Sequence, residues 1–243
     1  MAIAFNAAAD IGNGLSVSSL TKSYTSGSGS NRLLVLGVVG DGTSDLITGA
    51  TYAGTSLTLI DKQFPTNGAS THRWHYLFYL LAPATGANNV IISASSSCDV
   101  ITGTAGDYTG VKQSAQPDAH NKQYNGSGSP TSLTTSVTTV ANNDWAVLFE
   151  LGANSPTTAP TAGTGATRRA FDGTYFASGL FDSNGAVAAG SYSMTTNRSA
   201  TNDIIGHIVG AFSPFVSGGF TPVQRRTLSP IGTRIGSRQM QVS

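Results

Sequence analysis

The sequence predicts an all-β protein: an antiparallel, jelly-roll-like β-sandwich that carries an extended C-terminal arm. Short apolar runs bounded by Gly, Asn, Ser and Pro recur along the chain, a pattern typical of sandwiches and barrels. No apolar stretch of a dozen residues has helical spacing. Because 39% of the residues are hydrophobic and only 10% are charged, the composition is unlike that of a disordered chain. We expect about a dozen strands in two sheets.

The first half of the chain contains the clearest strands. Residues 32–41 are apolar at nearly every position, which predicts a central strand that is buried on both faces. Residues 47–53 and 56–62 flank a Gly-Thr pair and predict a hairpin. Residues 71–82 are rich in aromatic side chains and are followed by a proline, so this segment predicts a strand that ends there.

The middle of the chain predicts strands separated by one long loop. Residues 89–95 follow a Gly/Asn turn, and residues 100–111 alternate small and apolar side chains. The polar stretch 112–130 predicts a long loop, and the Thr-rich stretch 131–140 predicts another strand.

The segment 144–151 predicts which side chains enter the core. Its period-two pattern places Trp145 and Phe149 on one apolar face. Glu150 falls on the opposite face, where we expect it to be solvated or to face an interface.

Weaker strands are expected near 162–170, 174–181 and 190–196, and a last buried strand over 203–212. We therefore assign residues 1–216 to a single sandwich domain. The Ser-Gly-Gly sequence at 217–219 is flexible by composition and begins the arm, residues 217–243.

Charge divides the chain in the same way. The whole chain has 13 Lys/Arg and 12 Asp/Glu, and four of the arginines and none of the acids follow Phe215. The body therefore has 9 − 12 = −3 charges and the arm +4. A body of this kind lacks the basic face that nucleic-acid binding needs.

Targeting signals are not recognised in the sequence. The single cysteine, Cys98, excludes an internal disulfide, and the N-terminus has no basic region that would indicate a signal peptide. No apolar run reaches the roughly 18 residues of a membrane span. We expect a protein made in the cytoplasm that binds neither membrane nor nucleic acid.

One resemblance covers about residues 45–150. The series TYAGTSLTLI (51–60), RWHYLFYLLAPATGANNVIISAS (73–95), GDYTGV (106–111) and NDWAV (143–147) resembles a β-sandwich module of bacteriophage virion proteins and environmental bacterial surface proteins. The resemblance implies a sandwich fold on a particle or cell surface and implies no single activity. The arm is not part of that module.

Motifs of catalysis are not found in the sequence. Glu150 is the only glutamate, whereas glycoside hydrolysis needs two carboxyl groups across a cleft. No Gly-x-Ser-x-Gly motif is present, and no His or Asn adjacent in the sequence suggests activation of Cys98. His72 and His75 are three apart on an expected strand and so point to opposite faces, and His207 is expected in the core. We expect no catalytic site.

The sequence also contains two acidic loops that could suggest a metal site and an aromatic strand that could suggest a sugar-binding site. The loops at 41–45 and 182–185 contain acids but do not follow the spacing of an EF-hand, so we expect no metal and no cofactor. Trp74, Tyr76 and Phe78 share one strand face. Core packing is the favoured interpretation, and an exposed sugar-binding platform is the alternative.

The arm contains a near-repeat, IGTR followed by IGSR. In an extended chain, alternate side chains point to opposite faces. One face would carry Ile231, Thr233, Ile235 and Ser237, and the other would carry Arg234 and Arg238. A disordered tail and a nucleic-acid-binding arm are alternatives, but a docking arm that adds an extended segment to a partner subunit fits best. The expected partner-binding residues are Arg225, Arg226, Ile231, Arg234, Ile235 and Arg238.

The combined sequence features favour a structural virion protein. We expect a phage capsid decoration (cement) protein or a tail-associated protein, located in the virion and anchored to neighbouring capsid or tail subunits by its arm, with homo-oligomers expected. The alternative is a carbohydrate- or receptor-binding sandwich on a fibre or cell surface, with a glycan as its partner. A hydrolase with an unrecognised site is a third, weaker hypothesis.

Overall fold

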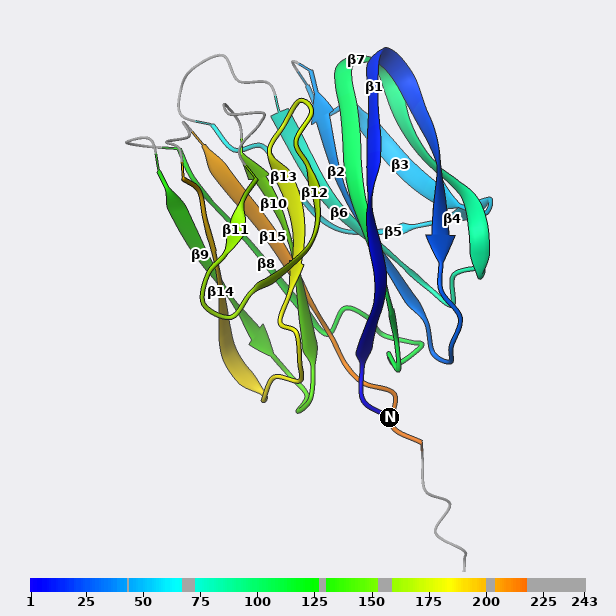
Figure 1. The fold of residues 1–243 in the computed structure, drawn as a ribbon, viewed down its shortest axis with the longest axis vertical. Helices are drawn as coiled ribbons and strands as arrows, with labels where there is room; N and C mark the ends of the chain where they lie inside the picture. Colours follow the sequence, from blue (N-terminus) through cyan, green and yellow to red (C-terminus); the bar gives the residue numbers. More distant parts are fainter. Residues whose placement is uncertain (43, 67–72, 127–129, 153–158, 200–203, 218–243) are drawn as a thin grey trace, which may run out of the picture.

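The computed structural model describes residues 1–42, 44–66, 73–126, 130–152, 159–199 and 204–217. These residues form fifteen strands and no helix (Figure 1). Every strand pairing among them is antiparallel. The prediction of an all-β, antiparallel, sandwich-like fold is therefore confirmed.

The strands are organised in three sheets, so the expectation of two sheets was wrong. Sheet I contains, in spatial order, β4 (Thr55–Ser56), β3 (Ile47–Tyr52), β7 (Gly86–Thr109), β2 (Leu33–Asp41), β6 (Arg73–Leu81) and β5 (Thr58–Gln63), with β1 (Ala4–Ser26) paired to β7. Sheet II contains β12 (Thr167–Asp172), β13 (Ser178–Asp182), β10 (Trp145–Gly152), β15 (Ile205–Phe212) and β8 (Ala119–Asn125). Sheet III contains β11 (Thr161–Ala162), β14 (Gly190–Asn197) and β9 (Ser132–Thr139).

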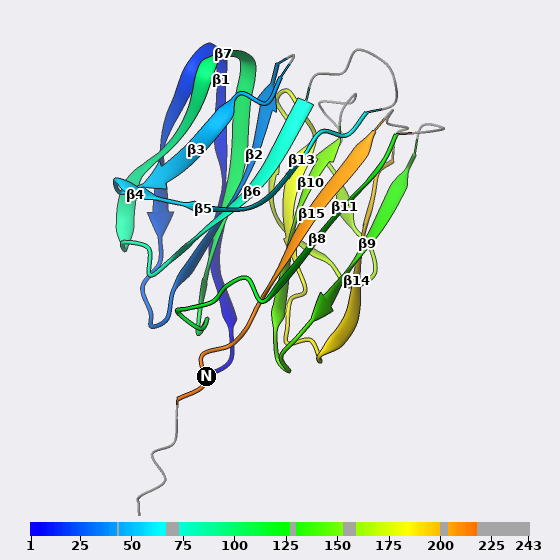
Figure 2. The ribbon, with the colours of Figure 1, turned by 180° about the vertical axis from the view of Figure 1, so that it is seen from behind.

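Sheet I folds over on itself, which produces four layers. Strands β1 and β7 pair along their whole length, but the register jumps from Val17–Cys98 to Ser19–Ser93. Both strands bend there and run back beside themselves (Figure 1). The first part of β7 pairs with β3, and the last part pairs with β2. Sheet I therefore has an outer half, with β3 and β4, and an inner half, with β2, β6 and β5, and the inner half faces sheet II (Figure 2).

Three apolar cores separate the four layers. The core inside the fold of sheet I includes Leu36, Tyr52 and Ile92. The core between the inner half and sheet II includes Val35 and Phe149. A smaller core between sheets II and III contains Leu148, Phe181, Met194 and Val209 among its members. Strands β2, β10 and β15 lie between two cores and are buried along nearly their whole length, which explains their continuous apolar sequences.

The strand predictions divide into confirmed and wrong ones. Five of the clearest predicted strands are confirmed: 32–41 by β2, 71–82 by β6, 131–140 by β9, 144–151 by β10 and 203–212 by β15. The weaker strands expected in the second half are confirmed by β12, β13 and β14. The hairpin is confirmed, but its turn residues are Ala53 and Gly54 rather than the Gly54–Thr55 pair. Both have positive φ angles, as a two-residue type I′ turn requires. The strand expected at 56–62 is divided, because β4 pairs with β3 whereas β5 crosses over to pair with β6.

Three segments differ from the sequence-based expectation. The strands expected at 89–95 and 100–111 are two halves of one bent strand, β7. The long loop expected at 112–130 contains β8, and the N-terminal segment, to which no strand was assigned, forms the 23-residue strand β1. Both missed strands are mostly exposed and polar and pair with one neighbouring strand each, so they lack the apolar alternation that reveals a strand.

Candidate functional site at the base of the sandwich

The end of the described chain is held firmly to the body. After β15, Ser213 accepts a hydrogen bond from the N–H of Lys112 (2.9 Å), and the N–H of Phe215 donates to the carbonyl of Gly110 (2.7 Å). The N-terminal ammonium group of Met1 donates to the carbonyl of Phe215 (2.9 Å). Both ends of the body therefore meet at one end of the molecule, here called the base (Figure 1).

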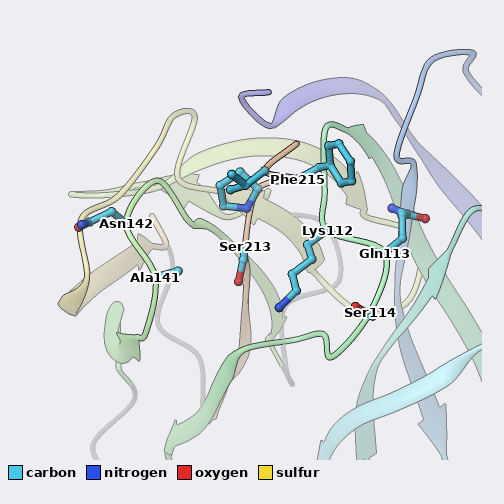
Figure 3. A pocket seen from close by; sticks show the side chains of 9 residues that line it. Lys112, Gln113, Ser114, Ala141, Asn142, Ser213 and Phe215 are labelled. Atoms are coloured by element: carbon cyan, nitrogen blue, oxygen red, sulfur yellow. The ribbon is translucent and has the colours of Figure 1, made fainter. Parts of the chain in front are cut away.

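Two hollows flank the exit of the chain at the base. The larger, about 530 Å³, is lined by Lys112, Gln113, Ser114, Ala141, Asn142, Ser213, Pro214, Phe215 and Val216 (Figure 3). The smaller, about 360 Å³, is lined by Met1, Ala2, Ile3, Asn143, Ala186, Pro214, Phe215 and Val216. Residues 214–216 thus form a wall between the two hollows, and the arm begins directly after them.

A pair of carboxyl groups lies beside the larger hollow. Asp118 and Asp144 both accept the N–H of Ala141 through an Oδ2 atom, each at 3.3 Å. Asp144 is fully buried. Burial, together with the neighbouring Asp118 carboxyl group, raises the pKa of Asp144 to about 7. The Asp144 carboxyl group is therefore partly protonated near neutral pH.

Glu150 is placed differently from the expectation of a solvated or interface-facing acid. It is fully buried between sheets II and III and pairs with Arg198, whose Nε lies 2.7 Å from its Oε1. Burial raises the pKa of Glu150, and the Arg198 charge opposes that shift. Arg198 also donates to the carbonyl of Ala177. The expectation was wrong because the partner cation lies 48 residues away in the sequence, where no local pattern connects the two.

The core position expected for His207 is confirmed. His207 is fully buried, and its two ring nitrogens lie 3.0 Å from the Thr135 hydroxyl and 2.8 Å from the Thr196 hydroxyl. Burial lowers its pKa to about 3, so the ring is neutral at ordinary pH.

His75 is also buried, between the inner half of sheet I and sheet II. It lies against Phe149, with ring centroids 6.3 Å apart, and over Gly206, where a Cβ atom would come within 2.7 Å of its ring. Its pKa is lowered to about 3, mainly by burial. His72, which the sequence pattern places on the opposite face of the same strand, lies outside the described residues.

The aromatic residues of β6 pack as a ladder rather than as an exposed platform. Ring centroids are 6.5 Å apart for Trp74 and Tyr76 and 6.1 Å apart for Tyr76 and Phe78. Tyr76 and Phe78 are buried in the core of sheet I, with Trp74 packed against it. Among the described residues, Tyr124 is the one aromatic side chain that is largely exposed. The core assignment of Trp145 and Phe149 is likewise confirmed.

The remaining candidate groups are engaged in the fold. Asp182 is fully buried and pairs with Arg169 at 2.7 Å. Asp45 pairs with Lys62 and accepts the Tyr76 hydroxyl. Cys98 is a buried free thiol at the bend of β7. No group of three or more His, Cys, Asp or Glu side chains that could hold a metal ion is found in the part of the chain that the structure describes.

The predicted partner-binding residues are not placed. Arg225, Arg226, Ile231, Arg234, Ile235 and Arg238 all lie outside the described residues, as does the arm from residue 218. The sequence analysis did not identify the two hollows that residues 214–216 line. The Pro-Phe-Val run before the Ser-Gly-Gly sequence was the available signal, because exposed apolar residues at a domain boundary indicate a contact surface.

Comparison with known proteins gives no relative for this chain: no family model, no curated protein and no solved structure matches it. Within the described residues, no helix has the length and hydropathy that a membrane span requires.

Proposed function

We propose that the protein is a structural component of a virion, a phage capsid decoration or tail-associated protein that is anchored to neighbouring subunits by its C-terminal arm. The observation that carries this proposal is the attachment of the arm. The residues before it are held by main-chain hydrogen bonds to 110–112 and by the N-terminal ammonium group. An arm that starts from such a fixed point transmits force from its docking site to the body.

Charge and packing are consistent with this role. The body has a net charge of −3 and the arm a net charge of +4. This positive charge favours docking of the arm on an acidic partner surface. The body buries Glu150 and, from its aromatic ladder, Tyr76 and Phe78. The contribution of such a protein is contact area on the particle, with no chemical step, and its expected location is the virion.

The proposal is tested by deleting the arm. A chain that ends after Gly219 retains all fifteen strands, so we expect it to fold and to remain soluble. We expect it to lose at least tenfold in co-sedimentation with phage particles purified from a strain that lacks this protein. Equal binding of the truncated and full chains would refute the proposed role of the arm.

Two double variants identify what the arm contributes. R234E/R238E should weaken co-sedimentation more at low salt than at high salt, because exposed ion pairs are screened over about 10 Å at 0.1 M ionic strength. I231S/I235S should weaken it with little salt dependence, because the lost contribution is apolar burial. Binding of purified glycans by the truncated body would instead favour the carbohydrate-binding alternative.

A further inference from the structure

Two fully buried histidines flank β15 on its opposite faces. His75 of β6 lies over Gly206, where a Cβ atom would come within 2.7 Å of the imidazole ring. His207 is the next residue of β15, and its ring lies on the other face, against the hydroxyl groups of Thr135 and Thr196 in sheet III. Because β15 lies between two cores, one imidazole is enclosed between sheets I and II and the other between sheets II and III.

The surroundings of His75 do not compensate a positive charge. Neither of its ring nitrogens has a hydrogen-bond partner among the described residues. The carboxylate of Asp61 on β5 attracts a proton to this ring, but its two oxygens are already paired, 2.8 Å from the Lys122 Nζ and 3.3 Å from the His120 Nδ1. Lys122 of β8 repels an imidazolium, and the backbone of Gln63 favours it only weakly. A proton on His75 would therefore be a poorly compensated buried charge.

The surroundings of His207 have the same character. The carboxylate beside it belongs to Glu150, its cross-strand partner on β10, and that carboxylate is already paired with Arg198 at 2.7 Å. The Arg198 guanidinium group and, across β15, His75 both disfavour a further positive charge. The two ring nitrogens of His207 are used by threonine hydroxyl groups, which are neutral. On both faces of β15, therefore, the nearby carboxylate is neutralised by another cation, and the imidazole fits the fold only in its neutral form.

We propose that these two histidines make β15 an acid-operated switch: the body is closed at neutral pH, and proton uptake by His75 and His207 separates sheet II from both neighbouring sheets as the pH falls. This inference goes beyond the proposed function and does not depend on it, because both histidines lie in the body. Since the two imidazoles lie back to back across one strand, a proton on one disfavours a proton on the other while the body is closed. Opening relieves both at once.

The direction of the pH effect follows from burial. The pKa of each imidazole is lowered from its ordinary value of 6.5 to about 3, mainly by burial, so the opened chain binds both protons more tightly than the closed body. Stability is complete above pH 6.5 and is lost as the pH falls toward 3, by about tenfold in the unfolding equilibrium constant per pH unit for each histidine. Asp144 and Glu150 contribute with the opposite sign, because their pKa values are raised.

The inference is tested by urea unfolding of the full chain at several pH values from about 7 to about 4, followed by near-UV circular dichroism, which reports side-chain packing. H75L, H207Q and the double variant H75L/H207Q are compared with the wild type at each pH, so that the contributions of Asp144 and Glu150 are present in every sample. Over one pH unit near pH 5, the unfolding constant of the wild type should rise about tenfold relative to each single variant and about a hundredfold relative to the double variant.

L77M is the matched control. Leu77 is fully buried, shares a face of β6 with His75 and does not titrate, so the ratio of its unfolding constant to that of the wild type should be the same at every pH. Ratios for H75L and H207Q that are equally constant overturn the inference. A pH-dependent ratio for only one of them overturns it too, because the switch requires both faces of β15. If H75L does not fold at pH 7, H75M replaces it with the same expectation.

Discussion

At the scale of single residues, buried carboxyl groups in this protein are accommodated in contrasting ways. Asp107 is fully buried and accepts hydrogen bonds from the Tyr24 hydroxyl (2.6 Å), the Asn6 side chain (2.8 Å) and the Gly27 N–H (3.0 Å). It thereby holds both ends of β1 to β7. Asp144, by contrast, faces a second carboxyl group. The first arrangement compensates a buried charge with several hydrogen bonds, whereas in the second the neighbouring carboxyl group and burial outweigh the hydrogen bond from the Ala141 N–H.

The Asp144 carboxyl group makes stability depend on pH in a defined direction. Its folded-state pKa, about 7, is above its ordinary value of 3.8, so the folded protein binds the proton more tightly than the unfolded chain. This contribution to stability is complete below about pH 4 and is lost as the pH rises to 7. We expect D144N to gain stability relative to the wild type as the pH rises from 4 to 8, measured by urea midpoints.

An exposed site on β7 that does not titrate provides the control. Ser97 is exposed on β7, so the difference in midpoint between S97A and the wild type should stay constant over the same pH range. If the D144N difference is also constant, the pKa of Asp144 is not raised in the folded protein.

The buried pair of Glu150 and Arg198 makes a second prediction at this scale. Removal of one partner leaves an uncompensated charge, which typically costs about 3–5 kcal/mol, whereas replacement of both by apolar groups costs much less. We expect R198M alone to lower the free energy of unfolding strongly and E150L/R198M to recover most of that loss. Equal losses in the single and double variants would mean that the pair contributes nothing specific to the packing of sheet III on sheet II.

At the scale of elements, one close contact joins the inner half of sheet I to sheet II. Phe149 of β10 lies directly on the backbone of Gly37 of β2: a Cβ atom at position 37 would come within 2.1 Å of the ring. A glycine in an otherwise apolar central strand therefore marks the place where a large ring enters from the neighbouring sheet. This contact sets how closely the two sheets approach each other.

The contact predicts non-additive mutations. F149A should cost about 3–5 kcal/mol because it leaves a cavity, and G37A should be destabilising because its methyl group collides with the ring. The double variant G37A/F149A should cost less than the sum, because the added methyl group enters the space that the ring leaves. Free energies of unfolding from denaturant titrations measure all three.

Gly49 provides the control for this cycle. A Cβ atom at Gly49 meets nothing within 4 Å, so G49A should change the free energy of unfolding by well under 1 kcal/mol beyond the ordinary effect of replacing glycine in a strand. Additive losses for Gly37 and Phe149 would contradict the direct contact between them.

At the scale of the whole molecule, the four-layer arrangement determines which strands open least. Strands β2, β10 and β15 are buried by layers on both sides, whereas β8 is exposed along most of its length. Amide hydrogen exchange follows local opening. We expect the slowest exchange in β2, β10 and β15 and exchange at least a hundredfold faster in β8. Uniform protection across these strands would argue that the body opens only as a single unit.

The sequence by itself determined the fold class and the strands with strong side-chain signals. Apolar runs identified β2, β10 and β15, the aromatic run identified β6, and period two placed Trp145 and Phe149 in the core. These predictions succeeded because burial of apolar side chains is the dominant favourable contribution to folding and is recorded directly in the residue pattern. The charge difference between body and arm is likewise a property of the sequence alone.

Only the tertiary structure decided the number of sheets, the strands β1 and β8, the bend of β7, the burial of Glu150 and the hollows at the base. Each of these depends on which distant segment becomes a neighbour. An edge strand of small and polar residues is fixed by main-chain hydrogen bonds to its partner, and backbone groups are alike in every sequence. Glu150 becomes a core residue only because Arg198 arrives beside it. The hollows form only where residues 1–3, 112–114, 141–143, 186 and 213–216 come together, and no local pattern encodes that meeting.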